Sequence, residues 1–141
     1  LFPQTTWIVC IRDPFRAIES LRNTFQPDAD VERWLRVWLD LVRWAQTDDR
    51  VLTWRIDAIP VDFDARLAST SRLLQHCDLN HTPETIEFVR RWPVVHKVRP
   101  NDQRKFQFTK EDCRRWIERI PELTQYLPQY CQSREENHLP S

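Results

Sequence analysis

The sequence predicts an α/β fold that is rich in helix and built on a parallel sheet. Residues 7–11 form an unbroken apolar run without polar alternation, which is typical of a strand covered on both faces in such a sheet. Residues 51–56 form a second predicted strand, and the apolar residues between the two strands recur at helical spacing. Because helical connections join neighbouring parallel strands, we expect the two strands to pair in parallel.

The end of the first strand is expected to turn directly into a helix. Asp13 is a favourable N-cap, and Pro14 suits the first helical position because its missing N–H would have no intrahelical partner. Ligands of open α/β sheets bind beyond the carboxyl ends of the strands, where a helix N-terminus favours anions. Arg12 adds a planar guanidinium suited to phosphate oxygens. The run predicts a phosphate site, and the competing interpretation is an arginine that caps a strand end.

The helix that follows has two predicted faces. The apolar face holds Pro14, Phe15, Ile18, Leu21 and Phe25, and the roughly opposite face holds Arg16, Ser20 and Asn23. Ser20 lies roughly 10 Å beyond Asp13 along the helix axis, at about 1.5 Å per residue. Its hydroxyl therefore reaches an anion at Arg12 only if the long arginine leans along the helix. The alternative is a serine on a solvated face.

The remaining elements follow from local signals. A helix over residues 31–45 is predicted to bury a stripe of tryptophan and aliphatic side chains. Further helices are expected over residues 63–77, 82–92 and 109–120, the last opened by a capping box from Thr109 to Asp112. Residues 96–105 lack periodicity and are expected to form a loop, and residues 133–141 a polar tail.

Composition describes one soluble domain with a real core. The chain has 141 residues, of which 40% are hydrophobic and 30% charged. Lysine plus arginine equal aspartate plus glutamate at 21 each, so net charge gives no reason to expect nucleic acid or a membrane surface as a partner. No apolar run is long enough to predict a membrane span, and no signal-peptide pattern opens the chain.

A local excess of positive charge lies in the C-terminal half. Residues 90–105 contain a single acid and six basic residues, which are Arg90, Arg91, Lys97, Arg99, Arg104 and Lys105. This basic segment is the second candidate anion surface, and the alternative is a solvated run of charge.

Cysteine and histidine positions argue against a metal cofactor. The four cysteines are far apart and include no C-x-x-C pair, and Cys10 falls inside the first strand. They are expected to be reduced structural thiols, a pattern that favours the cytoplasm. His76, Cys77 and His81 are neighbours in the sequence, but no second ligand cluster accompanies them at zinc-site spacing.

The opening run resembles the 3'-phosphate-binding segment of sulfotransferases that use 3'-phosphoadenosine 5'-phosphosulfate (PAPS). In that segment a hydrophobic strand is followed by Arg-(Asp/Asn)-Pro and by a serine eight residues after the arginine, which is the spacing of Arg12 and Ser20. Two later segments resemble the family in the same order. Residues 51–59 are similar to its next core strand and Arg-Tyr-Glu-Asp-Leu element, with Ile56, Asp57 and Ala58 in place of Tyr-Glu-Asp. Residues 97–106 and 109–111 are similar to its basic segment and final helix, without the usual glycines and tryptophan.

The resemblance implies a fold, a cofactor and a site. The fold would be the helix-rich C-terminal part of a P-loop NTPase-like parallel-sheet fold, with a partial sulfotransferase domain over residues 1–132 and a tail over residues 133–141. PAPS would donate a sulfuryl group to a hydroxyl or amine acceptor, without a metal. Arg12 and Ser20 would hold the 3'-phosphate of the nucleotide, and Arg99, Arg104 and Lys105 are further candidates for the same role.

Family members also need a glycine-containing 5'-phosphosulfate loop and a catalytic residue, commonly histidine, which both precede this strand. The chain contains no glycine, so we expect either the C-terminal part of a longer protein or the product of a truncated gene. We expect that this chain does not catalyse the transfer by itself, and we assign no catalytic residue. Two other classes remain open. One is a non-catalytic α/β module whose basic loop binds an anionic partner, such as a sulfated glycan or a nucleic acid. The other is a nucleotide or phosphoryl-transfer enzyme of the wider P-loop class.

Overall fold

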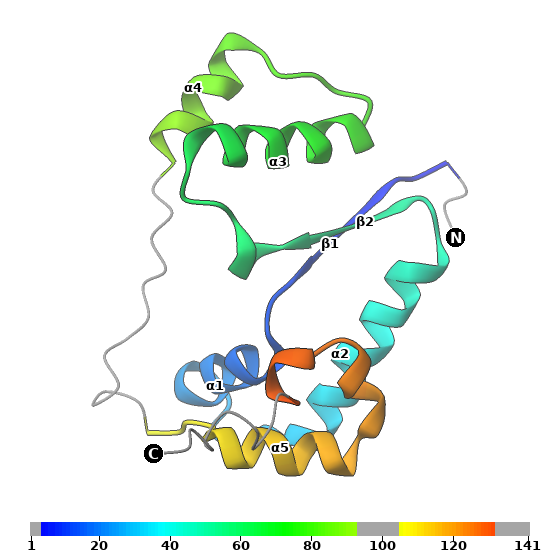
Figure 1. Ribbon diagram of the computed structural model, residues 1–141, viewed down its shortest axis with the longest axis vertical. Coiled ribbons are helices and arrows are strands. Elements are labelled where there is room, and N and C mark those ends of the chain that lie inside the picture. The colour runs from blue at the N-terminus through cyan, green and yellow to red at the C-terminus, as the bar shows by residue number, and fades with distance from the viewer. Residues whose placement is uncertain (1–3, 93–104, 132–141) are drawn as a thin grey trace, which may run out of the picture. The chain divides into compact units, whose positions relative to one another are not determined.

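A computed structural model describes residues 4–92 and 105–131, which form five α-helices and a two-stranded parallel sheet (Figure 1). The helix-rich α/β class is therefore confirmed. The chain divides into two compact units. The sheet unit comprises residues 1–13 and 41–100, and the helical unit comprises residues 14–40 and 101–141. Helix α2 (Val31–Thr47) supplies residues to both units.

The sheet unit is built on β1 (Trp7–Ile11) and β2 (Val51–Arg55). The two strands pair in parallel with Ile11 opposite Arg55, as the sequence predicts. Their carboxyl ends therefore lie at the same edge of the sheet. β2 ends one residue earlier than expected because Ile56–Ala58 forms a 3-10 turn, η1.

The prediction that the first strand is covered on both faces is wrong. Val9 and Ile11 are buried, whereas Ile8 and Cys10 are exposed. This alternation is the pattern of a strand with one covered face. Cys10 is therefore not a core thiol, although all four cysteines of the chain are free.

Helices α3 (Phe63–His76) and α4 (Pro83–Arg91) pack against each other and complete the sheet unit (Figure 1). Asp62 caps α3 by accepting a hydrogen bond from the backbone N–H of Ala65. Thr82 opens α4 with a capping box. Asp78, in the turn after α3, has a φ of 57°, which is in the left-handed region. Glycine usually occupies this region, but the chain contains none, and aspartate tolerates it better than most other residues.

The helical unit packs α1 (Pro14–Thr24), the first part of α2 and α5 (Lys110–Arg119) around one apolar core. Two 3-10 turns, η3 (Pro121–Gln125) and η4 (Pro128–Tyr130), follow α5. The predicted capping box from Thr109 to Asp112 is confirmed. The core consists of Phe15, Ile18, Leu35, Leu39, Phe108, Cys113, Ile117, Ile120, Leu123 and Leu127.

The predicted apolar faces are only partly buried. Phe15 and Ile18 of α1 are buried as expected, but Phe25 is 81% exposed because it lies beyond the last residue of the helix. The predicted stripe of α2 is likewise partly buried, since Leu35, Val42 and Ala45 are buried and Trp38 packs against the core, whereas Trp34 is 39% exposed. Within the ranges that the structure describes, no helix is long and apolar enough to cross a membrane.

Candidate functional site

The carboxyl edge of the sheet joins two of the segments that resemble sulfotransferases. Asp13 follows β1 and Asp57 follows β2, 44 residues later. The backbone N–H of Asp13 donates a hydrogen bond of 2.8 Å to Oδ2 of Asp57. Arg55 donates to both oxygens of the same carboxylate, at 3.3 and 3.2 Å. One aspartate therefore ties the loop after β1 to the turn after β2.

The environment of Asp57 favours its ionised form. Partial burial raises the pKa of Asp57, but hydrogen bonds from the Arg55 side chain and from the Asp13 backbone outweigh burial and hold the pKa below its ordinary value of 3.8. Asp57 is therefore an anion at neutral pH. Its contribution to stability is present above the pKa of the unfolded chain and is lost as the pH falls through the lowered pKa of the folded state.

The two residues proposed to hold a 3'-phosphate have different surroundings. Arg12 is half-buried and directly follows β1, and Ser20 is exposed on α1. Ser20 lies on the solvated side of the helix, as predicted. Arg12 belongs to the sheet unit and Ser20 to the helical unit. Their joint binding of one phosphate stays a prediction.

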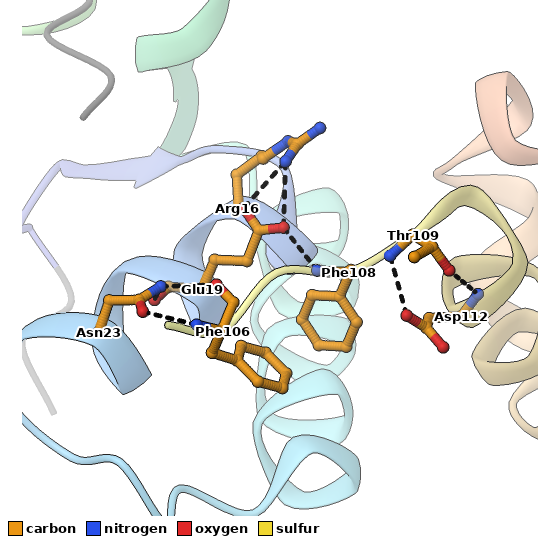
Figure 2. Close-up of polar contacts among 7 residues, drawn as sticks. All are labelled: Arg16, Glu19, Asn23, Phe106, Phe108, Thr109 and Asp112. Atoms are coloured by element: carbon orange, nitrogen blue, oxygen red, sulfur yellow. Dashed lines mark hydrogen bonds and ion pairs between the residues drawn. The ribbon is translucent and has the colours of Figure 1, made fainter. Parts of the chain in front are cut away.

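A polar clasp on α1, which the sequence analysis missed, holds an extended segment of the chain (Figure 2). Glu19 is only 3% exposed, and its Oε1 accepts a hydrogen bond of 2.8 Å from the backbone N–H of Phe108. Both oxygens of Glu19 also accept from Arg16, at 3.0 and 2.9 Å. One turn later, the amide of Asn23 accepts from the N–H of Phe106 at 2.9 Å and donates to its carbonyl at 2.7 Å.

The clasp corrects the prediction that Asn23 lies on a solvated face, because its side chain is half-buried and satisfies both backbone groups of Phe106. Glu19 and Asn23 are four residues apart and hence neighbours on one side of the helix. That spacing, beside the apolar Phe15 and Ile18, was the signal available in the sequence.

The clasp also places one end of the basic segment. Lys105 is exposed and directly precedes Phe106, so it lies where the clasp begins, in the same unit as Ser20. The other candidates for phosphate binding in this segment, Arg99 and Arg104, lie outside the residues that the structure describes.

The start of the basic segment is partly neutralised. Arg90 and Arg91 both form ion pairs with Glu87, at 3.8 and 2.7 Å. The guanidinium of Arg90 also lies 5.1 Å from the ring centroid of Phe63. These two arginines are engaged within the sheet unit, which makes them weaker candidates for binding an anion.

The histidines near Cys77 have structural partners. Nε2 of His76 lies 3.1 and 2.9 Å from the carbonyl oxygens of Trp7 and Arg50. The ring nitrogens of His81 each lie 3.2 Å from a threonine hydroxyl, Thr70 on α3 and Thr85 on α4. Among the residues that the structure describes, no group of three His, Cys, Asp or Glu side chains could hold a metal ion.

Comparison of the chain with protein-family models, with curated proteins and with solved structures gives no match in any of the three.

Proposed function

We propose that this chain is the nucleotide-binding part of a PAPS-dependent sulfotransferase and that it binds the 3'-phosphate of the nucleotide through Arg12 and Ser20. The guanidinium would bind two phosphate oxygens at once, and the hydroxyl would donate one further hydrogen bond. Lys105, Arg104 and Arg99 are secondary candidates for the same phosphate. In the full protein, the sulfuryl group would pass from PAPS to a hydroxyl or amine.

The observation that carries this proposal is the hydrogen bond between Asp13 and Asp57. It joins two segments that were selected separately for their resemblance to the family, at the edge of a parallel sheet where α/β proteins bind ligands. Arg12 is the residue before Asp13, so this bond limits how far the backbone beside Arg12 can move. The clasp on α1 adds support, because it anchors the third such segment to the helix that carries Ser20.

The test is calorimetric titration of the folded chain with 3'-phosphoadenosine 5'-phosphate at physiological salt, beside 5'-AMP. We expect binding that needs the 3'-phosphate. Arg12→Ala should weaken it by about tenfold or more, because a charged hydrogen bond contributes about 1.5–3 kcal/mol. Ser20→Ala should weaken it less, since a neutral hydrogen bond contributes about 1 kcal/mol.

The matched control is Arg43→Ala, which removes an exposed arginine of α2 from the same sheet unit and should leave the affinity unchanged. Equal affinity for 5'-AMP, equal loss in the Arg12 and Arg43 variants, or no binding by the folded chain would contradict the proposal. Salt-sensitive binding without selectivity for the 3'-phosphate would instead favour the non-catalytic module that binds an anionic partner.

A further inference from the structure

A polar groove in the sheet unit, whose lining includes none of the residues proposed to hold the 3'-phosphate, has the features of an anion site. It has a volume of about 250 Å³ and is lined by residues 52–55 of β2, by Ala58 and by Ser69 and Arg72 of α3. Neighbouring residues of a strand point to opposite faces, so a groove lined by four consecutive residues follows the strand's edge. β1 pairs with β2 along its other edge, and no further strand among the described residues pairs with β2.

The groove offers several kinds of hydrogen-bond donor. An edge strand presents backbone N–H groups that no neighbouring strand has taken. Thr53 and the half-buried Ser69 add hydroxyls. Ser69 and Arg72 are three residues apart on α3 and therefore share one side of the helix. The described lining contains no carboxylate.

The charged residues in the lining of the groove are two arginines, Arg55 and Arg72. Arg72 is exposed, and the positions three and four residues away on α3 hold Ala, Ser, Gln and His, so the helix gives it no acidic neighbour. Arg55 pairs with Asp57 through long, exposed contacts of 3.2–3.3 Å. Such pairs stabilise the fold little. A guanidinium has five N–H donors, which leaves Arg55 able to bind a second oxyanion.

We propose that this groove binds the phosphate or sulfate group of a small ester, with Arg72 and Arg55 as the cationic groups and Ser69 and Thr53 as hydroxyl donors. Its volume lies just below the range of about 300–1,000 Å³ usual for drug-sized ligands, which fits an oxyanion with a small attached group. Trp54, half-buried in the same lining, supplies an apolar wall for that group.

The test is a titration of the folded, isotope-labelled chain with phenyl phosphate and, separately, with phenyl sulfate, at constant ionic strength and followed by amide NMR. We expect saturable shifts confined to residues 52–55, 58, 69 and 72, and the stronger of the two ligands identifies the preferred anion. Arg72→Ala should weaken binding at least tenfold. The affinity of Arg72→Lys should lie between those of Arg72→Ala and the unaltered chain, because lysine keeps the charge but lacks the planar guanidinium.

Arg43→Ala is the matched control and should bind like the unaltered chain. Shifts that fail to saturate, shifts spread over basic residues away from the groove, or equal affinity in the Arg72 and Arg43 variants would overturn the proposal. The proposals for the groove and for the 3'-phosphate site can be contradicted separately. Arg12→Ala should leave the phenyl phosphate shifts unchanged, and Arg72→Ala should leave the selectivity for a 3'-phosphate unchanged.

Discussion

At the scale of single residues, Glu19 places a charge against the core of the helical unit because donors from Arg16 and Phe108 meet its carboxylate. A buried charge is tolerated only when it is paired and hydrogen-bonded. The same contacts make Glu19 the link between α1 and the residues that follow the basic segment.

Replacing Glu19 by alanine should lower the free energy of unfolding by about 2 kcal/mol, because the buried N–H of Phe108 loses its acceptor. Glu19→Gln keeps an acceptor and should fall between the alanine variant and the unaltered chain. Chemical denaturation measures both. The control is Glu118→Ala, an exposed glutamate of α5 whose removal should change stability by no more than about 0.5 kcal/mol. Equal losses in the free energy of unfolding for the Glu19 and Glu118 alanine variants would show that the contacts of Glu19 do not stabilise the fold.

At the scale of elements, a single arginine fastens α3 to α4. Arg66 of α3 is 6% exposed, and its Nε and Nη2 donate to the carbonyl of Val89 at 3.1 and 2.9 Å. Its Nη1 donates to the carbonyl of Val61 at 2.6 Å. Val89 lies in the last turn of α4, where helical carbonyls lack partners and the helix dipole favours a cation.

Arg66→Met preserves much of the side-chain volume but removes every donor. It should lower the free energy of unfolding by about 3 kcal/mol, because two carbonyls are left without a partner. Amide hydrogen exchange should show a loss of protection in α4. Chemical denaturation measures the overall loss in the free energy of unfolding. Arg43→Met provides the exposed comparison and should be nearly neutral. If both variants unfold at the same denaturant concentration, the contacts of Arg66 do not hold the two helices together.

At the scale of the whole molecule, the helical unit depends on one continuous apolar core. Phe15 is 1% exposed and packs edge-to-face on Phe108 and Tyr130, at centroid distances of 5.2 and 5.1 Å. Leu123 and Leu127, in and just after the short turn η3, are fully buried beside them. Residues after the last long helix therefore complete the core.

Leu123→Ala should lower the free energy of unfolding by about 3 kcal/mol, within the range of about 2–5 kcal/mol for leucine-to-alanine changes in a core. Thermal and chemical denaturation should agree on the size of the loss. Leu79→Ala is the control, because Leu79 is 56% exposed in the turn after α3. A loss at position 123 no larger than the loss at position 79 would show that η3 is not part of the core.

The sequence by itself determined the elements and the fold class. Pro14, the capping box at Thr109 and the turn before Pro83 each act through neighbours within a few residues, so helix starts could be predicted closely. Both strands could be predicted from the sequence, the first from its apolar run, and the helical connection between them indicated their parallel pairing.

Only the tertiary structure decided which groups meet. The Asp13–Asp57 bond spans 44 residues, and the bonds from α1 to Phe106 and Phe108 span 83 and 89. The groove likewise needs a strand edge and a helix side to face each other. Local propensity acts over a turn or two, whereas these contacts depend on how distant segments pack. For the same reason the sequence predicted Cys10 and Trp34 as buried, and packing left both exposed.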